Sequence, residues 1–248
     1  MSKFIENPNL PKSEVTLILC GQMNRVIIDY FHSRGIKTYF AQENEAADTA
    51  VCDHIDLSAI HLGNNKVLLD KKQDALAVAL KNEGSKVFHS FESVSGEYPR
   101  DIALNFAFMG EHVIGNEKYA DKNLCSFFTG KKIINVNQGY TKCSCLIVNE
   151  KAVITDDPSI YKATVKEGID CLLISKGDVK LHGHSYGFIG GASGKPSQGE
   201  VIFFGDIKMH RDYEKIKFYL YKHGCKIISF DGVPLTDYGG IIPLKERA

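Results

Sequence analysis

The sequence predicts a mixed α/β fold in which five copies of a strand-strand-helix-strand (ββαβ) unit form a five-bladed α/β-propeller with pseudo-fivefold symmetry. Three observations support this. Residues 143–175 contain one complete unit, other stretches repeat its order of strands, turns and helix, and five glycines each precede a short apolar strand. Because one such unit can bury its apolar face only against its neighbours, this periodicity is typical of repeat proteins. We therefore expect the units to close into a ring.

The complete unit shows how each element is specified. A first apolar strand ends at a turn formed by Asn149 and Glu150, and a second strand follows. Pro158 then opens a helix, because proline suits the first helical turn, and Gly168 ends it. A buried strand completes the unit.

The remaining units repeat this order. Residues 58–90 contain two strands, a helix near 72–83 and a final strand, and the stretch from Phe188 gives a glycine-rich hairpin, a helix and a final strand. Residues 103–136 have a short helix or irregular link, and the N-terminal unit has a helix near 24–33. The glycines before the five final strands are Gly35, Gly84, Gly130, Gly168 and Gly224.

Two segments lie outside this pattern. Residues 1–14 are expected to be a polar lead-in, which Pro8 and Pro11 keep out of regular structure. Residues 41–54 are acidic and weakly periodic, so we expect a loop over the mouth of the domain. No linker divides the chain, and residues 1–248 are expected to form one domain.

Composition excludes several classes of partner. Lys plus Arg and Asp plus Glu are 30 each in 248 residues, so no bulk charge favours nucleic acid or an anionic membrane surface. No run approaches the roughly 20 apolar residues of a membrane-spanning helix, and the N-terminus carries acidic residues where a signal peptide would be basic. Seven cysteines, several of them in apolar strands, are typical of reduced cytosolic thiols. We expect a soluble, cytoplasmic protein with a small-molecule ligand, and leave a homodimer open.

A polar cluster follows the final strand of every unit. In a ring, equivalent junctions lie at the same end, so we expect these clusters to meet in one central pocket, where loops on a rigid scaffold bind ligands. The clusters are residues 52–56, 98–101 with Asn105, 137–144, 182–188, and Asp231 with 237–240.

Over about residues 15–244, this pattern resembles the pentein, or guanidino-group modifying, fold. The strings YPRDIALN, QGYTKCS and YGFIGGASGK are similar to those of an uncharacterised clostridial-type family of that fold. The resemblance implies five ββαβ blades and chemistry on guanidine C–N bonds, as in arginine and agmatine deiminases, dimethylarginine hydrolases and amidinotransferases.

The resemblance also implies site residues. Arg100 and Asp101 match an Arg-Asp pair of the fold's hydrolases. His184 matches the histidine of their His-x-Glu-Gly motif, with Tyr186 in place of the glutamate. Their nucleophilic cysteine follows a glycine-rich turn near the C-terminus, where residues 241–243 of this chain are Ile-Ile-Pro.

Guanidine hydrolysis needs carboxylates to hold the cation, a thiolate to attack its carbon and an acid for the departing amine. Cys143 is the candidate nucleophile, with Lys142 beside it to favour the thiolate, and the alternative is a buried structural thiol. His184 and His54 are the candidate proton carriers, and the alternative is a solvated histidine. The alternative for Asp101 is an ion pair or turn cap with Arg100. The expected substrate contacts are Asp56, Arg100, Asp101, Asn105, Lys142, Tyr186 and Phe188.

Other patterns have structural interpretations. Asp70, Asp156 and Asp206 precede helices and are expected to act as N-caps. Residues 190–195 lack the spacing of a phosphate-binding loop, and their glycines favour a close approach of the backbone to a ligand. Cys143-x-Cys145 with His182-x-His184 has the residue types but not the spacing of a zinc site, so no metal or cofactor is predicted.

Two functions from different classes remain. The first is an amidinohydrolase- or deiminase-like enzyme that acts on a guanidine, amidine or related C–N bond through a cysteine. The second is a divergent, non-catalytic pentein that binds a small polar ligand in the central pocket. A scaffold protein without a pocket is disfavoured, because polar clusters recur at every junction.

Overall fold

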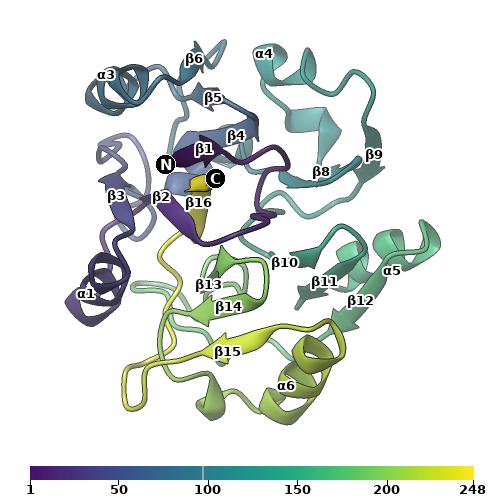
Figure 1. Ribbon diagram of the computed structural model, residues 1–248. Helices are drawn as coiled ribbons and strands as arrows, with labels where there is room; N and C mark the ends of the chain where they lie inside the picture. Colours follow the sequence, from purple (N-terminus) through teal and green to yellow (C-terminus); the bar gives the residue numbers. More distant parts are fainter. Residues whose placement is uncertain (97) are drawn as a thin grey trace.

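Five small β-sheets with helices at their periphery make up the protein, as the computed structural model, which describes residues 1–96 and 98–248, shows (Figure 1). Four sheets have three strands each, and the order of strands in each sheet follows the sequence. They comprise β4 (Ala59–Gly63), β5 (Lys66–Leu69) and β6 (Lys86–His89); β7 (Ala107–Met109), β8 (His112–Gly115) and β9 (Lys132–Asn135); β10 (Cys145–Asn149), β11 (Ala152–Thr155) and β12 (Asp170–Leu173); and β13 (Ser193–Ser197), β14 (Glu200–Phe203) and β15 (Lys226–Ile228).

Each of these sheets has the pairing that the ββαβ repeat predicts. The first two strands form an antiparallel hairpin, and the third strand pairs parallel to the second after a helical crossover. The helical elements are α1 (Arg25–Ser33), α2 (Ile55–Ser58), α3 (Asp74–Asn82), α4 (Lys122–Cys125), α5 (Pro158–Lys166) and α6 (Tyr213–Lys222), with short 3-10 turns η1 (Arg100–Ile102), η2 (Glu117–Tyr119) and η3 (Ile207–Met209).

The first sheet is completed by the end of the chain. Its order is β1 (Ser2–Phe4), β16 (Ile241–Arg247), β2 (Val15–Cys20) and β3 (Lys37–Phe40). Strand β16 pairs antiparallel with β2 and so takes the place of the first strand of a hairpin. Strand β1 pairs with the other edge of β16, and the two termini lie close together in Figure 1. The expectation of an irregular lead-in was therefore wrong for Ser2–Phe4.

Apolar side chains form five core clusters, and each cluster contains residues from two neighbouring sheets. One unites Leu146 of β10 with Phe203 of β14, and another unites Ile18 of β2 with Ile202 of β14, so that the last sheet packs against the first. Each fully buried Leu, Ile or Phe contributes roughly 1.5–3 kcal/mol to folding. Burial between sheets, rather than within one sheet, is therefore what holds the repeats together.

Two local expectations need correction. The third strand of each unit is only partly buried, as in Asp170–Leu173, because it forms the outer edge of its sheet. Asp157, not Asp156, caps α5 by accepting the backbone N–H groups of Ser159 and Ile160.

The other two predicted caps fare differently. Asp206 caps the short turn η3 and not the helix α6 that was expected to follow it, whose N-cap is Asp212. The carboxylate of Asp70 accepts the N–H of Lys72 ahead of α3, whose N-cap is Gln73, so Asp70 is not a helix cap. Within the described residues, no helix is long and apolar enough to cross a membrane.

Candidate active site

One cavity of about 340 Å³ collects residues from all five polar junction clusters. Its size suits a small metabolite. Acidic, aromatic and histidine side chains dominate the lining, and none of its described residues is Lys or Arg. It is lined by Asp48, Val51, His54, Leu57, Gly96, Tyr98, Asp101, Tyr140, Cys143, Leu181, His184, Ser185, Tyr186, Phe188 and Asp237.

Among the described residues that line this cavity, Cys143 is the only thiol. It lies in the turn that precedes β10 and is 3% exposed. Its thiol donates a hydrogen bond to Oδ2 of Asp56 at 2.9 Å, and Nδ2 of Asn105 donates to its sulfur at 3.2 Å. Cys145, two residues later, is fully buried in the core. The structure thus separates the two thiols that share a strand in the sequence.

Asn105 does not line the pocket but supports residues that lie beside it through hydrogen bonds. Its side chain is fully buried, and its Oδ1 accepts the backbone N–H groups of Lys142 and Cys143. Its Nδ2 also donates to the backbone oxygen of Asp56 at 3.0 Å. With every polar atom used, Asn105 holds the segment of Asp56 against the segment of Cys143.

Burial and the neighbouring carboxylates favour the protonated thiol of Cys143. Burial raises the pKa of the Cys143 thiol well above its ordinary value, and the carboxylates of Asp56 and Asp237 raise it further. Burial also raises the pKa of Asp56 to about 6, although the nearby charges of His54 and Lys142 act in the opposite direction. A thiol beside a carboxyl group that ionises near pH 6 can pass its proton to that group once a cation enters the pocket.

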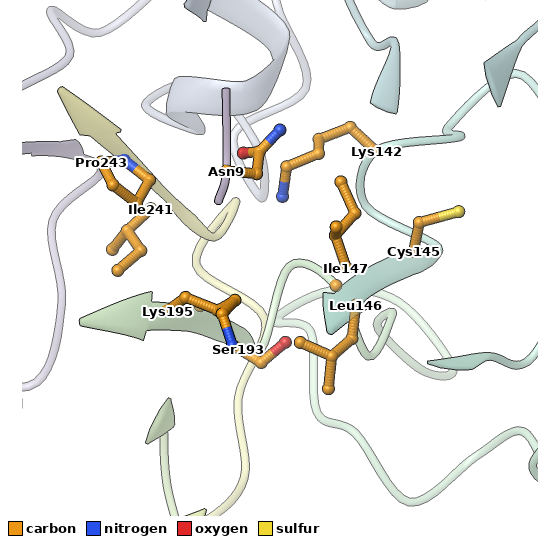
Figure 2. A pocket seen from close by; sticks show the side chains of 11 residues that line it. Asn9, Lys142, Cys145, Leu146, Ile147, Ser193, Lys195, Ile241 and Pro243 are labelled. Atoms are coloured by element: carbon orange, nitrogen blue, oxygen red, sulfur yellow. The ribbon is translucent and has the colours of Figure 1, made fainter. Parts of the chain in front are cut away.

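Lys142 and Asp56 lie behind the pocket rather than in its lining. Both line a narrow cavity of about 10 Å³, and Lys142 also borders a second cavity of that size. Figure 2 shows the Lys142 side chain extending into this second cavity beside Asn9. The predicted contact between Lys142 and a ligand in the pocket is therefore not supported, because the side chain lies outside the pocket lining.

Asp101 supplies a buried carboxylate to the lining. It lies in the turn η1, is 5% exposed, and its Oδ2 accepts the hydroxyl of Tyr140. Its Oδ1 is buried and has no hydrogen-bond partner among the described residues. Burial raises the pKa of Asp101, against the hydrogen bond from Tyr140. A buried acceptor without a partner in a pocket is a natural position for a ligand N–H group.

Aromatic rings form the walls beside Asp101. The ring of Tyr140 stacks on Phe188 with centroids 6.0 Å apart, and Tyr186 meets Phe188 edge to face at 5.9 Å. Tyr98 contacts Tyr140 on the other side, with centroids 6.2 Å apart. Faces of this kind attract cations through the ring quadrupole.

His54 is paired with Asp237. Both side chains are buried, and Nδ1 of His54 lies 3.8 Å from Oδ1 of Asp237. Backbone N–H groups of Phe188 and Gly239 also donate to the Asp237 carboxylate. A Cβ at Gly191 would lie 1.9 Å from Oδ1 of Asp237, so the glycine-rich segment 190–195 makes room for this carboxylate.

His184 and Arg100 lie further out. The side chain of His184 is 45% exposed at the rim, where its Nε2 lies 3.2 Å from Oδ2 of Asp48. Arg100 is exposed and borders a separate cavity of about 180 Å³. Both histidines expected to carry protons therefore lie beside a carboxylate, but only His54 is buried.

Asp237, Tyr140, Tyr98 and Asp48 line the pocket but were not among the predicted site residues. Asp237 was visible in the sequence as part of a junction cluster, which is the same signal that identified Asp101.

The position after the glycine-rich turn near the C-terminus is occupied by Ile241, which lies in strand β16 and is 1% exposed. In the described part of the chain all seven cysteines are free thiols, and no group of His, Cys, Asp and Glu has the arrangement of a metal site.

The raised pKa of Asp56 predicts a pH-dependent stability. Because its folded-state pKa of about 6 exceeds the ordinary value of 3.8, its contribution to stability is complete below about pH 4 and is lost as the pH rises through 6. The loss is roughly 3 kcal/mol. We expect Asp56→Asn to melt roughly 5–10 °C higher than the unchanged protein at pH 7.5 and at nearly the same temperature at pH 4.

Thermal melts monitored by circular dichroism at both pH values test this prediction. Glu45→Gln is the matched control, because Glu45 is exposed and does not line the pocket, so its melting temperature should not change at either pH. An equal change for Asp56→Asn at pH 4 and pH 7.5 would show that Asp56 does not titrate in this range.

Comparisons with known proteins identify a family and several similar solved structures. A family model described as a family of unknown function (DUF6873) matches residues 18–242. No curated protein sequence matches the chain. SxtG, an amidinotransferase from Microseira wollei in the saxitoxin biosynthetic pathway, is a similar solved structure, with a TM-score of 0.62, 10% identity, and coverage of 98% of both chains.

Two further solved structures are also similar to this chain. Agmatine deiminase from C. jejuni gives a TM-score of 0.57 with 14% identity, over 93% of this chain and 90% of that chain. DDAH from Pseudomonas aeruginosa, complexed with citrulline, gives 0.51 with 8% identity, over 95% of this chain and 100% of that chain. The chain therefore has the pentein fold that its repeats predict.

Proposed function

The chain belongs to the DUF6873 family, and we propose from this premise and its pentein fold that it is an enzyme acting on a guanidine, amidine or related C–N bond of a small cationic metabolite, with Cys143 as nucleophile. We also propose that the five sheets form one closed domain, a five-bladed propeller with pseudo-fivefold symmetry, which brings the junction clusters to a single pocket. The neighbours named above act on amidino and guanidino groups, which favours this class of substrate.

The observation that carries the proposal is the surroundings of Cys143. Its thiol faces a cavity whose described lining contains three aspartates, two histidines and no Lys or Arg, and a buried oxygen of Asp101 in that cavity lacks a partner. Such a pocket attracts a cation and disfavours an anion. A planar cation with several N–H donors would satisfy the free oxygen of Asp101 and pack on the faces of Tyr140 and Phe188.

Binding of the cation also activates the thiol. A positive charge beside the sulfur lowers the pKa of Cys143, and the proton of the thiol passes to Oδ2 of Asp56. The thiolate then attacks the central carbon of the amidinium group and forms a C–S bond. His54, held by Asp237, donates a proton to the nitrogen of the breaking C–N bond, and the amine leaves.

The second half of the reaction removes the group bound to sulfur. Water, deprotonated by the now neutral His54, attacks the same carbon, the C–S bond breaks, and the thiolate recovers its proton from Asp56. If an amine attacks instead of water, the same steps give an amidinotransferase. Asn105 contributes by holding Cys143 and Asp56 together, and it does not touch the substrate.

A second candidate, a binding protein without catalysis, is favoured by one observation. The position near the C-terminus at which the fold's hydrolases are expected to have their cysteine is a buried isoleucine here, Ile241. The same pocket would then bind the cation through Asp101 and the aromatic walls, and Cys143 would not react with it. The two candidates differ in whether Cys143 reacts.

The test is modification by a haloacetamidine, an electrophile that carries an amidinium group. At pH 7 we expect selective labelling of Cys143, mapped by mass spectrometry, and protection by guanidines or amidines that raise the melting temperature. Labelling of Cys143 no faster than that of cysteines in the unfolded chain would exclude it as nucleophile and leave the binding protein. Ammonia or amine release from the protecting compounds then identifies the substrate.

A further inference from the structure

The charged side chains that line the pocket indicate which chemical group the substrate has at the end away from its guanidinium or amidinium group. Enzymes that bind an amino acid by its carboxylate use a cation, most often Arg, for that purpose. The described lining of this pocket contains no Lys or Arg. The cations nearby are engaged elsewhere or lie outside it: the Lys176 ammonium lies 3.8 Å from Asp157 and over the ring of Tyr186, and Arg100 borders a different cavity.

A carboxylate lies at the rim instead. Asp48 belongs to the acidic loop 41–54, its side chain is 49% exposed, and its Oδ1 accepts the N–H of Ala50 at 2.9 Å. That hydrogen bond, followed by the neighbouring His184, lowers the pKa of Asp48, so this group is ionised at neutral pH. His184 is held beside Asp48 and so is not a free cation for an incoming carboxylate.

Besides Asp237, which lies beside His54, the pocket thus has two acidic positions with apolar surface near them. Asp101 is buried and has an oxygen without a partner, whereas Asp48 faces solvent. The rings of Tyr98, Tyr186 and Phe188 and the side chains of Leu181 and Val51 line the same cavity. Aromatic and aliphatic surface of this kind suits a short alkyl chain, and the acidic positions suit a cation at each end.

We propose that the substrate is a dication: an amidinium or guanidinium group joined by a short apolar chain to a second, ammonium-type group, with no carboxylate. This inference rests on the proposed function and adds a role for Asp48, which binds the distal cation at the rim. Asp48 is a specificity-determining residue that never touches the reacting carbon.

Three ligands of equal chain length test the proposal: an ω-guanidinoalkylamine, an alkylguanidine, and an ω-guanidino carboxylic acid. Their dissociation constants are measured by calorimetry on the full chain carrying Cys143→Ser, which prevents turnover. We expect the guanidinoalkylamine to bind about fivefold more tightly than the alkylguanidine, and at least about twentyfold more tightly than the guanidino acid.

Variants of the rim sharpen this test. Asp48→Asn should remove the advantage of the guanidinoalkylamine while leaving the affinity for the alkylguanidine unchanged, and Asp48→Lys should turn the preference toward the guanidino acid. Glu45→Gln, the same loss of charge on the same loop but outside the pocket lining, should change neither. Asp48→Asn weakening all three ligands equally would assign Asp48 to structure and overturn the inference.

The outcomes also separate this inference from the function on which it rests. Tightest binding of the guanidino acid would overturn the dication and leave guanidine chemistry at Cys143 intact. Binding of none of the three ligands would overturn the proposed function, and the inference with it.

Discussion

Replacing Cys143 with serine is expected to lower turnover of the substrate by at least about a thousandfold and to abolish labelling by a haloacetamidine. The substitution removes the atom that forms the covalent intermediate, and losses of a nucleophile in enzymes of this kind are of this size or larger. Serine retains a hydroxyl that can donate to Asp56, as the thiol does, so the melting temperature should change little. Turnover is measured by release of ammonia or amine, and stability by thermal melting.

Cys145→Ala is the matched control for this experiment. Cys145 is two residues away and fully buried, but it packs in the core and does not line the pocket. Its replacement should cost some stability while leaving turnover and the labelling of Cys143 unchanged. A Cys143→Ser protein as active as the unchanged one would remove Cys143 from the mechanism, whatever the behaviour of Cys145.

Asp101→Asn is expected to weaken binding of a guanidinium ligand by thirtyfold or more, or about 2–4 kcal/mol. The asparagine keeps the size of the side chain and an acceptor for the hydroxyl of Tyr140, but it removes the negative charge and places an amide where the free Oδ1 accepts a ligand N–H. Stability should hold or rise slightly, because burial raises the pKa of Asp101 and its ionised form is costly in the free protein. Calorimetry measures the affinity, and thermal melts measure the stability.

Asp156→Asn provides the comparison for Asp101. Asp156 is also buried, burial raises its pKa to about 7, and its Oδ1 has no partner among the described residues, yet it does not line the pocket. Its replacement should raise stability at neutral pH without changing affinity. If Asp101→Asn loses stability and binds the ligand normally, Asp101 belongs to the structure of its turn and not to the site.

The repeat and the general position of the site were predictable from the sequence. Each unit carries its own local signals, such as Pro158 at the start of α5 and Gly168 after its end, and these act over a few residues. Junctions that recur in a repeat occupy equivalent positions, so polar clusters such as 98–101 and 182–188 could be expected to meet. The cavity that Asp101, Cys143, His54 and His184 line together agrees with that expectation.

The sequence did not predict which residues of these junctions face the cavity. Asp56 and Asn105 belong to the correct junctions, but they lie behind Cys143 and hold it in place. Lys142 is adjacent to Cys143 in sequence, yet its side chain enters a different cavity, because neighbouring residues along an irregular turn point in different directions. The prediction that Lys142 acts on the Cys143 thiol was based on adjacency in the sequence, and the position of the side chain in the fold does not support it.

By itself the sequence determined a chain of repeated ββαβ units, two of them incomplete, and a set of polar junctions rich in acids and histidines, since these are written in patterns a few residues long. Only the tertiary structure decided that β16 completes the first sheet, that Cys143 donates to Asp56 87 positions away, and that Asp237 holds His54. The physical reason is that such contacts depend on how whole sheets pack against one another. Packing of this kind leaves no periodicity in the segments that it joins.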